Sequence, residues 1–206
     1  MAIPIDNEKL PEKFRKMDKS FLKHLTEEDT SSFISFPKHT TFLGKEKDEN
    51  VVLVIRSHWM SYFKYIISAV LVLILPTVVA LLIPSLNTNL MLIVTIFLIS
   101  IMLSMSLAVY SFLMWFYNVN IITDRRVIDI DFKSVFFHTS SEARLEKIED
   151  VTSQQSGSFT NLLDIGTVHI QTAGTNAFIE FENVPKPREI QDILSDLLEL
   201  AHKGEI

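Results

Sequence analysis

The side chains that most often carry catalysis or bind metals are scattered through this sequence. Its six histidines never stand at the spacing of metal ligands, and the absence of cysteine excludes thiolate sites, cysteine nucleophiles and disulfides. It has no glycine-rich phosphate loop and no glycine-flanked nucleophilic serine. The acidic pairs Glu146/Glu149 and Asp129/Asp131 are interpreted as solvated strand or turn positions. The sequence therefore predicts a protein that is not an enzyme and has no cofactor and no metal site.

Charge is distributed unevenly along the chain, whose net charge is −6. Residues 1–64 carry eleven basic and ten acidic side chains, whereas residues 118–206 carry eight basic and fifteen acidic ones. Nucleic-acid binding requires a basic surface because the phosphate backbone dominates that affinity. The acidic C-terminal part therefore argues against a nucleic-acid partner.

Between these two parts lies a long stretch without any ionisable side chain. Residues 65–83 and 90–117 are continuous apolar segments, each long enough to cross a bilayer as a helix. Pro76 interrupts the first segment, where we expect a kink and not a break, because membrane helices tolerate proline. Residues 84–89 form an uncharged turn, so the two segments are predicted to make a transmembrane hairpin.

The basic residues predict how this hairpin is oriented. Arg56 and Lys64 precede the first segment and Arg125 and Arg126 follow the second, whereas the turn has neither lysine nor arginine. Since short cytoplasmic loops carry the excess of lysine and arginine, we expect both termini to be cytoplasmic in a multi-pass protein of the cell (inner or plasma) membrane, in contact with the lipid bilayer. The residues expected at the membrane interface are Arg56, His58, Trp59, Lys64 and Trp115.

After the second segment the pattern changes to that of strands. Apolar and polar residues alternate in short runs separated by glycine-containing turns, which is typical of an antiparallel sheet or barrel. The predicted strands are residues 118–123, 126–132, 135–139, 142–145, 151–156, 167–173 and 177–184. A helix beginning at Pro187 and ending near Gly204 closes the chain, and its apolar stripe is expected to pack across the sheet.

Several stretches together resemble one family, the bacterial pleckstrin-homology-like membrane proteins, in which two helices precede the domain. The stretches are GKEKDENVVLVIRSHW (44–59), NIITDRRVI (120–128), LEKIEDV (145–151), LDIGTV (163–168) and FENVP (181–185). The resemblance implies a membrane α-helical hairpin plus an antiparallel β pleckstrin-homology-like domain capped by a C-terminal α-helix. The expected division is an N-terminal arm and linker (1–50), a pre-membrane segment with the hairpin (51–117) and the cytoplasmic domain (118–206).

Two candidate binding sites follow from this division. Pleckstrin-homology domains often bind phosphoinositides through a basic first hairpin, and here that hairpin offers Arg125 and Arg126; a structural turn and a dock for an acidic protein segment are the alternatives. The next turn contains Lys133, Phe136 and Phe137. These phenylalanines are expected to lie partly in the core, to form a lipid-facing tip or to contact another copy of the chain.

The N-terminal arm contains a basic amphipathic segment over residues 8–25. It is expected to lie on an anionic membrane surface, to pack on the domain or a partner, or to be disordered. Residues 26–50 are interpreted as a linker, and the apolar run 51–56 is a candidate for an additional strand.

Two functions are compatible with these observations. The first is a membrane-anchored, non-catalytic interaction module whose cytoplasmic domain binds a protein partner or further copies of itself. The alternative is a lipid-engaging membrane protein that uses the basic N-terminal helix and the Phe136-Phe137 tip.

Overall fold

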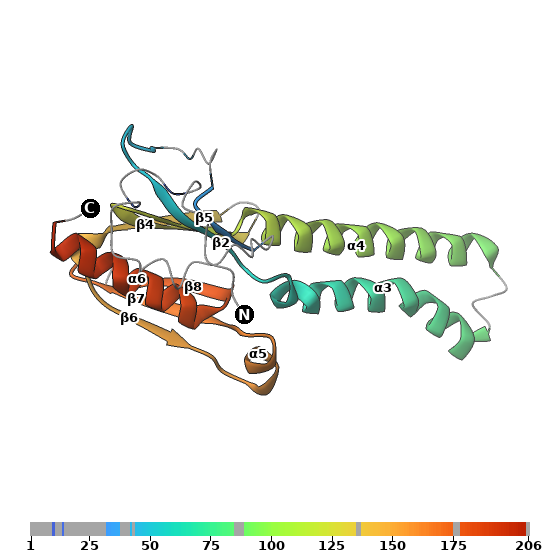
Figure 1. Cartoon of the computed structure of the whole chain (residues 1–206). Helices are drawn as coiled ribbons and strands as arrows, with labels where there is room; N and C mark the ends of the chain where they lie inside the picture. Colours follow the sequence, from blue (N-terminus) through green and yellow to red (C-terminus); the bar gives the residue numbers. More distant parts are fainter. Residues whose placement is uncertain are drawn as a thin grey trace. The chain divides into compact units, whose positions relative to one another are not determined.

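The computed structural model describes residues 10, 14, 32–37, 42, 44–84, 89–134, 137–174 and 178–204. It divides the chain into two compact units. We call Trp59–Tyr117 the helical hairpin, and Met1–His58 with Asn118–Ile206 the β-domain. Each unit is described separately below (Figure 1).

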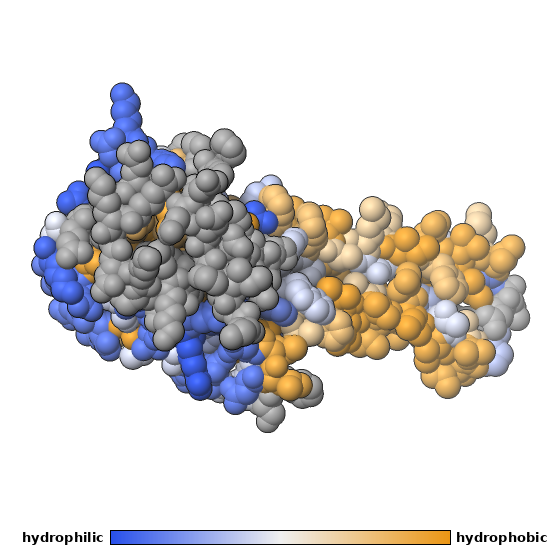
Figure 2. Space-filling model, viewed as in Figure 1, coloured by the Kyte–Doolittle hydropathy of each residue, from blue (hydrophilic) through white to orange (hydrophobic). Residues whose placement is uncertain are grey.

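The helical hairpin consists of a 3₁₀ turn, η1 (Trp59–Tyr62), and two α-helices, α3 (Phe63–Leu82) and α4 (Leu90–Tyr117). Both candidate spans, Trp59–Leu82 and Leu90–Tyr117, are long and apolar enough to cross a membrane, with mean hydropathy of 2.7 and 2.6. Most of their large side chains are exposed, as the hydrophobic surface of this unit in Figure 2 illustrates. The predicted helices are therefore present, and the first begins two residues earlier than expected.

Pro76 lies inside α3, which continues through it as predicted. Proline has no backbone N–H, so the carbonyl four residues earlier, that of Val72, loses its usual helical donor. The hydroxyl of Ser100 on α4 donates a hydrogen bond of 2.5 Å to this carbonyl. One side chain of α4 thus satisfies the backbone group that the proline leaves unpaired, and it joins the two helices.

The β-domain contains two antiparallel sheets among its described residues. The larger sheet has the strand order β1-β2-β3-β4-β5 and the smaller has the order β6-β7-β8. The strands are β1 (Phe33–Ser35), β2 (Val51–Arg56), β3 (Val119–Thr123), β4 (Arg126–Ser134), β5 (Phe137–Arg144), β6 (Ile148–Gln154), β7 (Ile165–Thr172) and β8 (Phe178–Pro185). A 3₁₀ turn η3 (Leu145–Lys147), a short helix α5 (Ser158–Leu162) and the final helix α6 (Pro187–His202) complete the unit.

The structure confirms one sequence-based interpretation before the hairpin and corrects another. The candidate strand at 51–56 is present as β2, which pairs with β3 from Val51↔Thr123 to Arg56↔Val119 within the β-domain. Part of the predicted linker is strand β1, which pairs with β2. The interpretation failed because β1 has only three residues, too few for a periodic pattern.

A second correction concerns β5. The sequence predicted two strands, at 135–139 and 142–145, whereas the structure has one continuous strand paired with β4. The polar run Thr139–Ser141 suggested a turn, yet all three residues pair across to β4. An edge strand can be polar because only one of its sides joins the sheet.

One hydrophobic core lies between the sheets and α6. Helix α6 begins with proline at its first turn and places its apolar stripe, including Ile190, Ile193 and Leu197, fully inside this core. These residues meet strand residues such as Ile122 and Phe181. The structure therefore confirms the predicted architecture of a helical hairpin followed by antiparallel sheets capped by a C-terminal helix.

Two residues of the N-terminal segment also belong to the core. Leu10 and Phe14 are 2% and 0% exposed, and the Phe14 ring lies edge-on to Phe36, with ring centroids 5.3 Å apart. These two members of the amphipathic stripe thus pack on the domain. The rest of residues 8–25 lies outside the described residues.

Candidate functional site

The β-domain has two ends, which the strand register defines. Arg56, His58 and Val119 lie at the end where the chain leaves for α3 and returns from α4, which we call the tether end. The turn between β3 and β4, at Asp124 and Arg125, lies at the opposite end, which we call the far end. Thr123 lies four residue steps after Val119, so β3 spans roughly 13 Å between the two ends.

The β3–β4 turn at the far end is held by buried polar contacts. The Asp124 carboxylate accepts hydrogen bonds from the backbone N–H and the side-chain amide of Asn50, at 3.0 and 3.2 Å. The Thr123 hydroxyl accepts from the backbone N–H groups of Arg125 and Arg126, at 3.2 and 3.0 Å. The sequence predicted a tight turn here, and these contacts fix its conformation.

Arg126 is held at this turn by a bidentate ion pair with Glu49. Its Nε and Nη2 donate to the two carboxylate oxygens of Glu49, both at 2.9 Å, and the Glu49 side chain is completely buried. Nη1 donates to Glu142 at 3.0 Å and Nη2 also to the Gly44 carbonyl at 2.6 Å. Because its guanidinium donors are occupied by protein groups, the geometry favours the structural-turn alternative for Arg126 over ligand binding.

The ion pair shifts the pKa values of both partners. Burial alone would raise the Glu49 pKa, but hydrogen bonds from Arg126, the Glu46 backbone and Thr123 outweigh it and leave that pKa below its ordinary value. The hydrogen bond to Glu49 raises the pKa of Arg126 despite partial desolvation. Both groups are therefore charged at neutral pH and act as a fixed structural unit.

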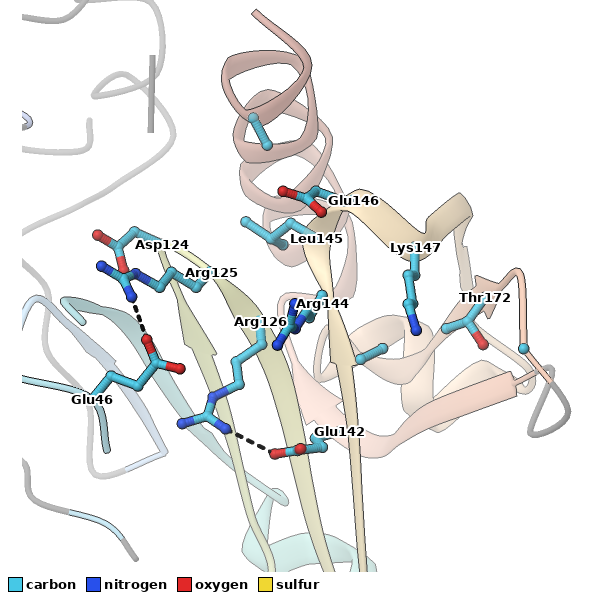
Figure 3. A pocket seen from close by; sticks show the side chains of 13 residues that line it. Glu46, Asp124, Arg125, Arg126, Glu142, Arg144, Leu145, Glu146, Lys147 and Thr172 are labelled. Carbon is cyan, nitrogen blue, oxygen red and sulfur yellow. Dashed lines mark hydrogen bonds and ion pairs between the residues drawn. The ribbon is translucent and has the colours of Figure 1, made fainter. Parts of the chain in front are cut away.

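A pocket of about 680 Å³ opens beside this turn (Figure 3). Two backbone hydrogen bonds join its walls, from Leu145 N to Arg125 O at 3.0 Å and from Ala173 N to Lys147 O at 2.9 Å. The first bond connects η3 to the β3–β4 turn, and the second connects η3 to the end of β7. Ala201 of α6 also lines the pocket, which therefore forms where both sheets and the last helix meet.

The charged residues of this pocket balance one another. They are Arg125, Arg126, Arg144 and Lys147 against Glu46, Asp124, Glu142 and Glu146. Arg125 pairs with Glu46, and Figure 3 draws both this contact and the one between Arg126 and Glu142. The pocket thus carries no surplus of positive charge, although four of its lining residues are cations.

Arg144 and Lys147 are the cations that sequence reasoning missed. Both are exposed, and neither side chain has an ion-pair or hydrogen-bond partner within the described part of the chain. Arg144 lies directly opposite Arg126 in the β4–β5 pairing. Only the register of that hairpin brings the two arginines together, and splitting β5 into two strands concealed it.

The second predicted binding turn is described only in part. Lys133 and Phe137 lie near the ends of β4 and β5, at the tether end beyond Val119, since Val119 pairs with Ile130. Their side chains and the whole of Phe136 lie outside the described residues. The lipid-facing tip therefore stays a prediction.

The residues predicted at a membrane interface lie around the ends of the helices. Arg56 ends β2, and the His58 backbone N–H donates to the Asn183 carbonyl at 2.7 Å, so both belong to the tether end. Desolvation by burial lowers the pKa of His58. In the hairpin, Trp59 is 48% exposed at the start of η1 and its ring lies edge-on to Phe63.

Lys64 and Trp115 complete this set. The Lys64 ammonium lies over the Tyr65 ring, 5.1 Å from its centroid, near the start of α3. Trp115 is half-buried near the end of α4, and its ring packs against Phe112. These positions, at the helix ends nearest the β-domain in sequence, suit amphipathic side chains at an interface.

The described residues contain no group of three or more histidine, cysteine, aspartate and glutamate side chains that could hold a metal ion. Of the acidic pairs, Glu149 accepts a hydrogen bond of 3.3 Å from the Gln171 amide on the neighbouring strand. Asp129 and Asp131 lie two residues apart on β4. Glu149, Asp129 and Asp131 thus lie on strands, one of the positions that the sequence predicted, and the two aspartates are half-buried.

Two long apolar helices joined to a small sheet domain capped by one helix define the class of protein to which this chain belongs. A family model described as Bacterial PH domain matches residues 59–198, from the first apolar helix into α6. Since this match covers more than half of the chain, the protein belongs to the bacterial PH domain family. That family is typically non-catalytic.

Other comparisons add little to this assignment. Comparison with curated proteins gives no match. Among solved structures, the chain is similar to a DUF1696 family protein with a pleckstrin-homology domain from Shewanella loihica PV-4, at 15% identity and a TM-score of 0.32. The similarity covers 39% of this chain and 70% of that one, and the fold described above does not depend on it.

Proposed function

We propose that this protein is a membrane-anchored, non-catalytic interaction module whose β-domain binds a segment of a protein partner, or of another copy of itself, at the far-end pocket. The observation that carries this proposal is the pocket itself. Its charges balance as a whole, yet two of its exposed cations, Arg144 and Lys147, have no side-chain partner within the described part of the chain.

Charge balance favours a protein segment over a phosphorylated lipid headgroup. A headgroup with several phosphates requires a surplus of positive charge, whereas this pocket offers as many carboxylates as cations. A polypeptide carries both signs and can match such a surface, which gives specificity through complementary pairs. Phosphoinositide-like binding at Arg125 and Arg126 is therefore the weaker hypothesis, since each of these arginines already contacts a glutamate.

Strand β5, whose last residues line the pocket, supplies a second reason to propose a protein segment as the ligand. Within the described part of the sheet, β5 is an edge strand, paired with β4 alone. Its last residues, from Thr139 to Arg144, contain no proline, which would remove a main-chain donor from this edge. An extended peptide could add to this edge by main-chain hydrogen bonds and place its side chains in the pocket.

The helical hairpin supports anchoring in a bilayer. Its two spans are long and apolar, and basic residues flank them only on the β-domain side of the sequence. By the distribution of lysine and arginine, both termini are cytoplasmic in a multi-pass protein of the cell membrane. The β-domain then presents its pocket to the cytoplasm.

The lipid-engaging alternative loses part of its basis. It requires the apolar stripe of the N-terminal segment to enter the membrane, but Leu10 and Phe14 of this stripe are buried in the β-domain core. A side chain buried in the core cannot contact lipid unless the core opens. The Phe136-Phe137 tip is the part of this alternative that is still a prediction.

Site-specific photocrosslinking in intact cells tests the proposal. A photoreactive amino acid at Glu146, in the pocket, is expected to give an adduct of one defined mass, either with a second protein or with another copy of the chain. The matched control is Glu180, an exposed glutamate on β8 that lies outside the pocket. Equal adducts at both positions, or adducts with lipid alone at Glu146, would contradict a protein-binding pocket. Arg144→Ala together with Lys147→Ala is expected to weaken the specific adduct.

A further inference from the structure

Helix α5 presents apolar side chains to the outside of the β-domain. It lies in the connection between β6 and β7 (Figure 1). Leu162 at its end is 80% exposed, and the following Leu163 is 37% exposed. The other leucines that the structure describes in this domain lie mostly in the core, so Leu162 and Leu163 together form a small exposed apolar surface at this connection.

The chain around α5 is held in place, so these leucines are presented by a defined structure. Asn161 N donates to the Gly157 carbonyl at 3.2 Å, which closes the helical turn. After the helix, both the carboxylate and the backbone carbonyl of Asp164 accept hydrogen bonds. The Gln155 amide donates to its carboxylate at 2.7 Å, and the Lys186 backbone N–H donates to its carbonyl at 2.8 Å.

These bonds place α5 at the tether end. Ile165, three residues after Leu162, pairs with Pro185 at the end of β8. Two residues before Pro185, the Asn183 carbonyl accepts from the His58 backbone N–H at 2.7 Å. His58 is followed directly by Trp59, the first residue of a candidate membrane span. A path of a few residues within the β-domain thus connects the exposed leucines to the point where the chain enters the hairpin.

We propose that Leu162 and Leu163 insert into the interface of the bilayer that holds the hairpin. This inference rests on the proposed anchoring of the hairpin. The tether holds the β-domain at the membrane surface, so insertion is effectively intramolecular and two leucines suffice where a free domain would need a larger apolar surface. A lipid surface fits better than a protein because α5 lies at the tether end, where the β-domain is joined to the proposed membrane anchor.

Insertion would also fix the orientation of the β-domain. Because α5 lies at the tether end, its insertion would leave the far-end pocket, at the opposite end of the sheets, on the side of the β-domain away from the membrane. The inserted leucines thus keep the proposed binding pocket accessible to a cytoplasmic protein.

The absence of cysteine from the chain permits a direct test by single-cysteine labelling. An environment-sensitive fluorophore is attached to the full-length protein at Leu162→Cys in vesicles of phosphatidylcholine and phosphatidylglycerol. Quenching is measured with lipid-borne nitroxide and with aqueous iodide. The matched control is Phe178→Cys, a 61% exposed apolar residue at the other end of β8, about 23 Å along the strand from Pro185. Leu71→Cys, on an exposed position of α3, reports whether the hairpin itself is in the bilayer.

We expect lipid quenching at position 162 to be at least about three-fold stronger than at position 178, with the reverse order for iodide. Iodide quenching of 162 equal to that of 178 overturns the inference while leaving the anchoring intact, provided position 71 is quenched by lipid. A label at 162 shielded from both quenchers indicates a protein contact and also overturns it. Absence of lipid quenching at position 71 overturns the anchoring itself.

Discussion

The hydrogen bond between Ser100 and the Val72 carbonyl makes a quantitative prediction about the hairpin. Pro76 removes the donor that would normally satisfy this carbonyl, and the Ser100 hydroxyl replaces it at 2.5 Å. Ser100 is itself only 7% exposed. The substitution Ser100→Ala therefore leaves a carbonyl without a donor in an apolar environment.

The expected loss of stability on Ser100→Ala follows from the apolar surroundings of this hydrogen bond. Interhelical hydrogen bonds in membranes contribute about 0.6 kcal/mol on average and up to about 1.7 kcal/mol. Because the carbonyl has lost its helical donor, we expect a value in the upper half of this range, about 1 kcal/mol or more. This corresponds to about a five-fold decrease in the ratio of folded to unfolded hairpin.

A double-mutant cycle distinguishes this mechanism from a general loss of packing. Alanine at position 76 restores a backbone N–H that can bond to the Val72 carbonyl, so Ser100→Ala should cost less in the Pro76→Ala background. The matched control is Ser106→Ala, at an exposed position of α4. We expect this control to change the stability by less than about 0.5 kcal/mol.

The measurement is the unfolding of the full-length protein in lipid bicelles by a denaturing detergent. Tryptophan fluorescence reports the hairpin, since both tryptophans of the chain, Trp59 and Trp115, lie in it. An equal loss of stability for Ser100→Ala with and without Pro76 would refute the proposed compensation. A loss of the same size for Ser106→Ala would show that any serine substitution in α4 is equally costly.

Two further predictions concern the β-domain. Glu49→Gln removes the charge that pairs with Arg126 in a buried site and is expected to lower the free energy of unfolding by about 2 kcal/mol or more, whereas Glu142→Gln, at a 65% exposed partner of the same arginine, should cost less than about 1 kcal/mol. Hydrogen exchange at the β3–β4 turn measures both, and similar losses would contradict the structural role of Glu49. The lowered pKa of His58 means that the unfolded chain binds a proton more readily than the folded chain. Its contribution to stability is thus complete above about pH 6.5 and is lost as the pH falls through the folded pKa, a decline that His58→Gln should reduce. An NMR titration that places the His58 pKa at or above about 6.5 would contradict this prediction.

The sequence by itself determined the elements whose signal is local. A stretch without ionisable residues predicts two apolar helices because each residue of a bilayer span must tolerate lipid. Alternation over residues 118–132 placed β3, β4 and the turn between them, and the stripe after Pro187 placed α6. These predictions succeeded because periodicity depends on residues close in the chain.

The tertiary structure alone decided which distant residues meet. Glu49 and Arg126 lie 77 residues apart, on opposite sides of the hairpin in sequence, and only the pairing of β2 with β3 brings them together. Arg144 joins them through the register of β4 with β5, and Leu10 and Phe14 reach the core although their amphipathic pattern suited a membrane surface equally well. An apolar stripe predicts that one face of an element is buried, but it does not predict which surface buries that face. That choice depends on shape and register over the whole fold, and this is why the far-end pocket and the exposed Leu162 of α5 were not predictable from the sequence pattern.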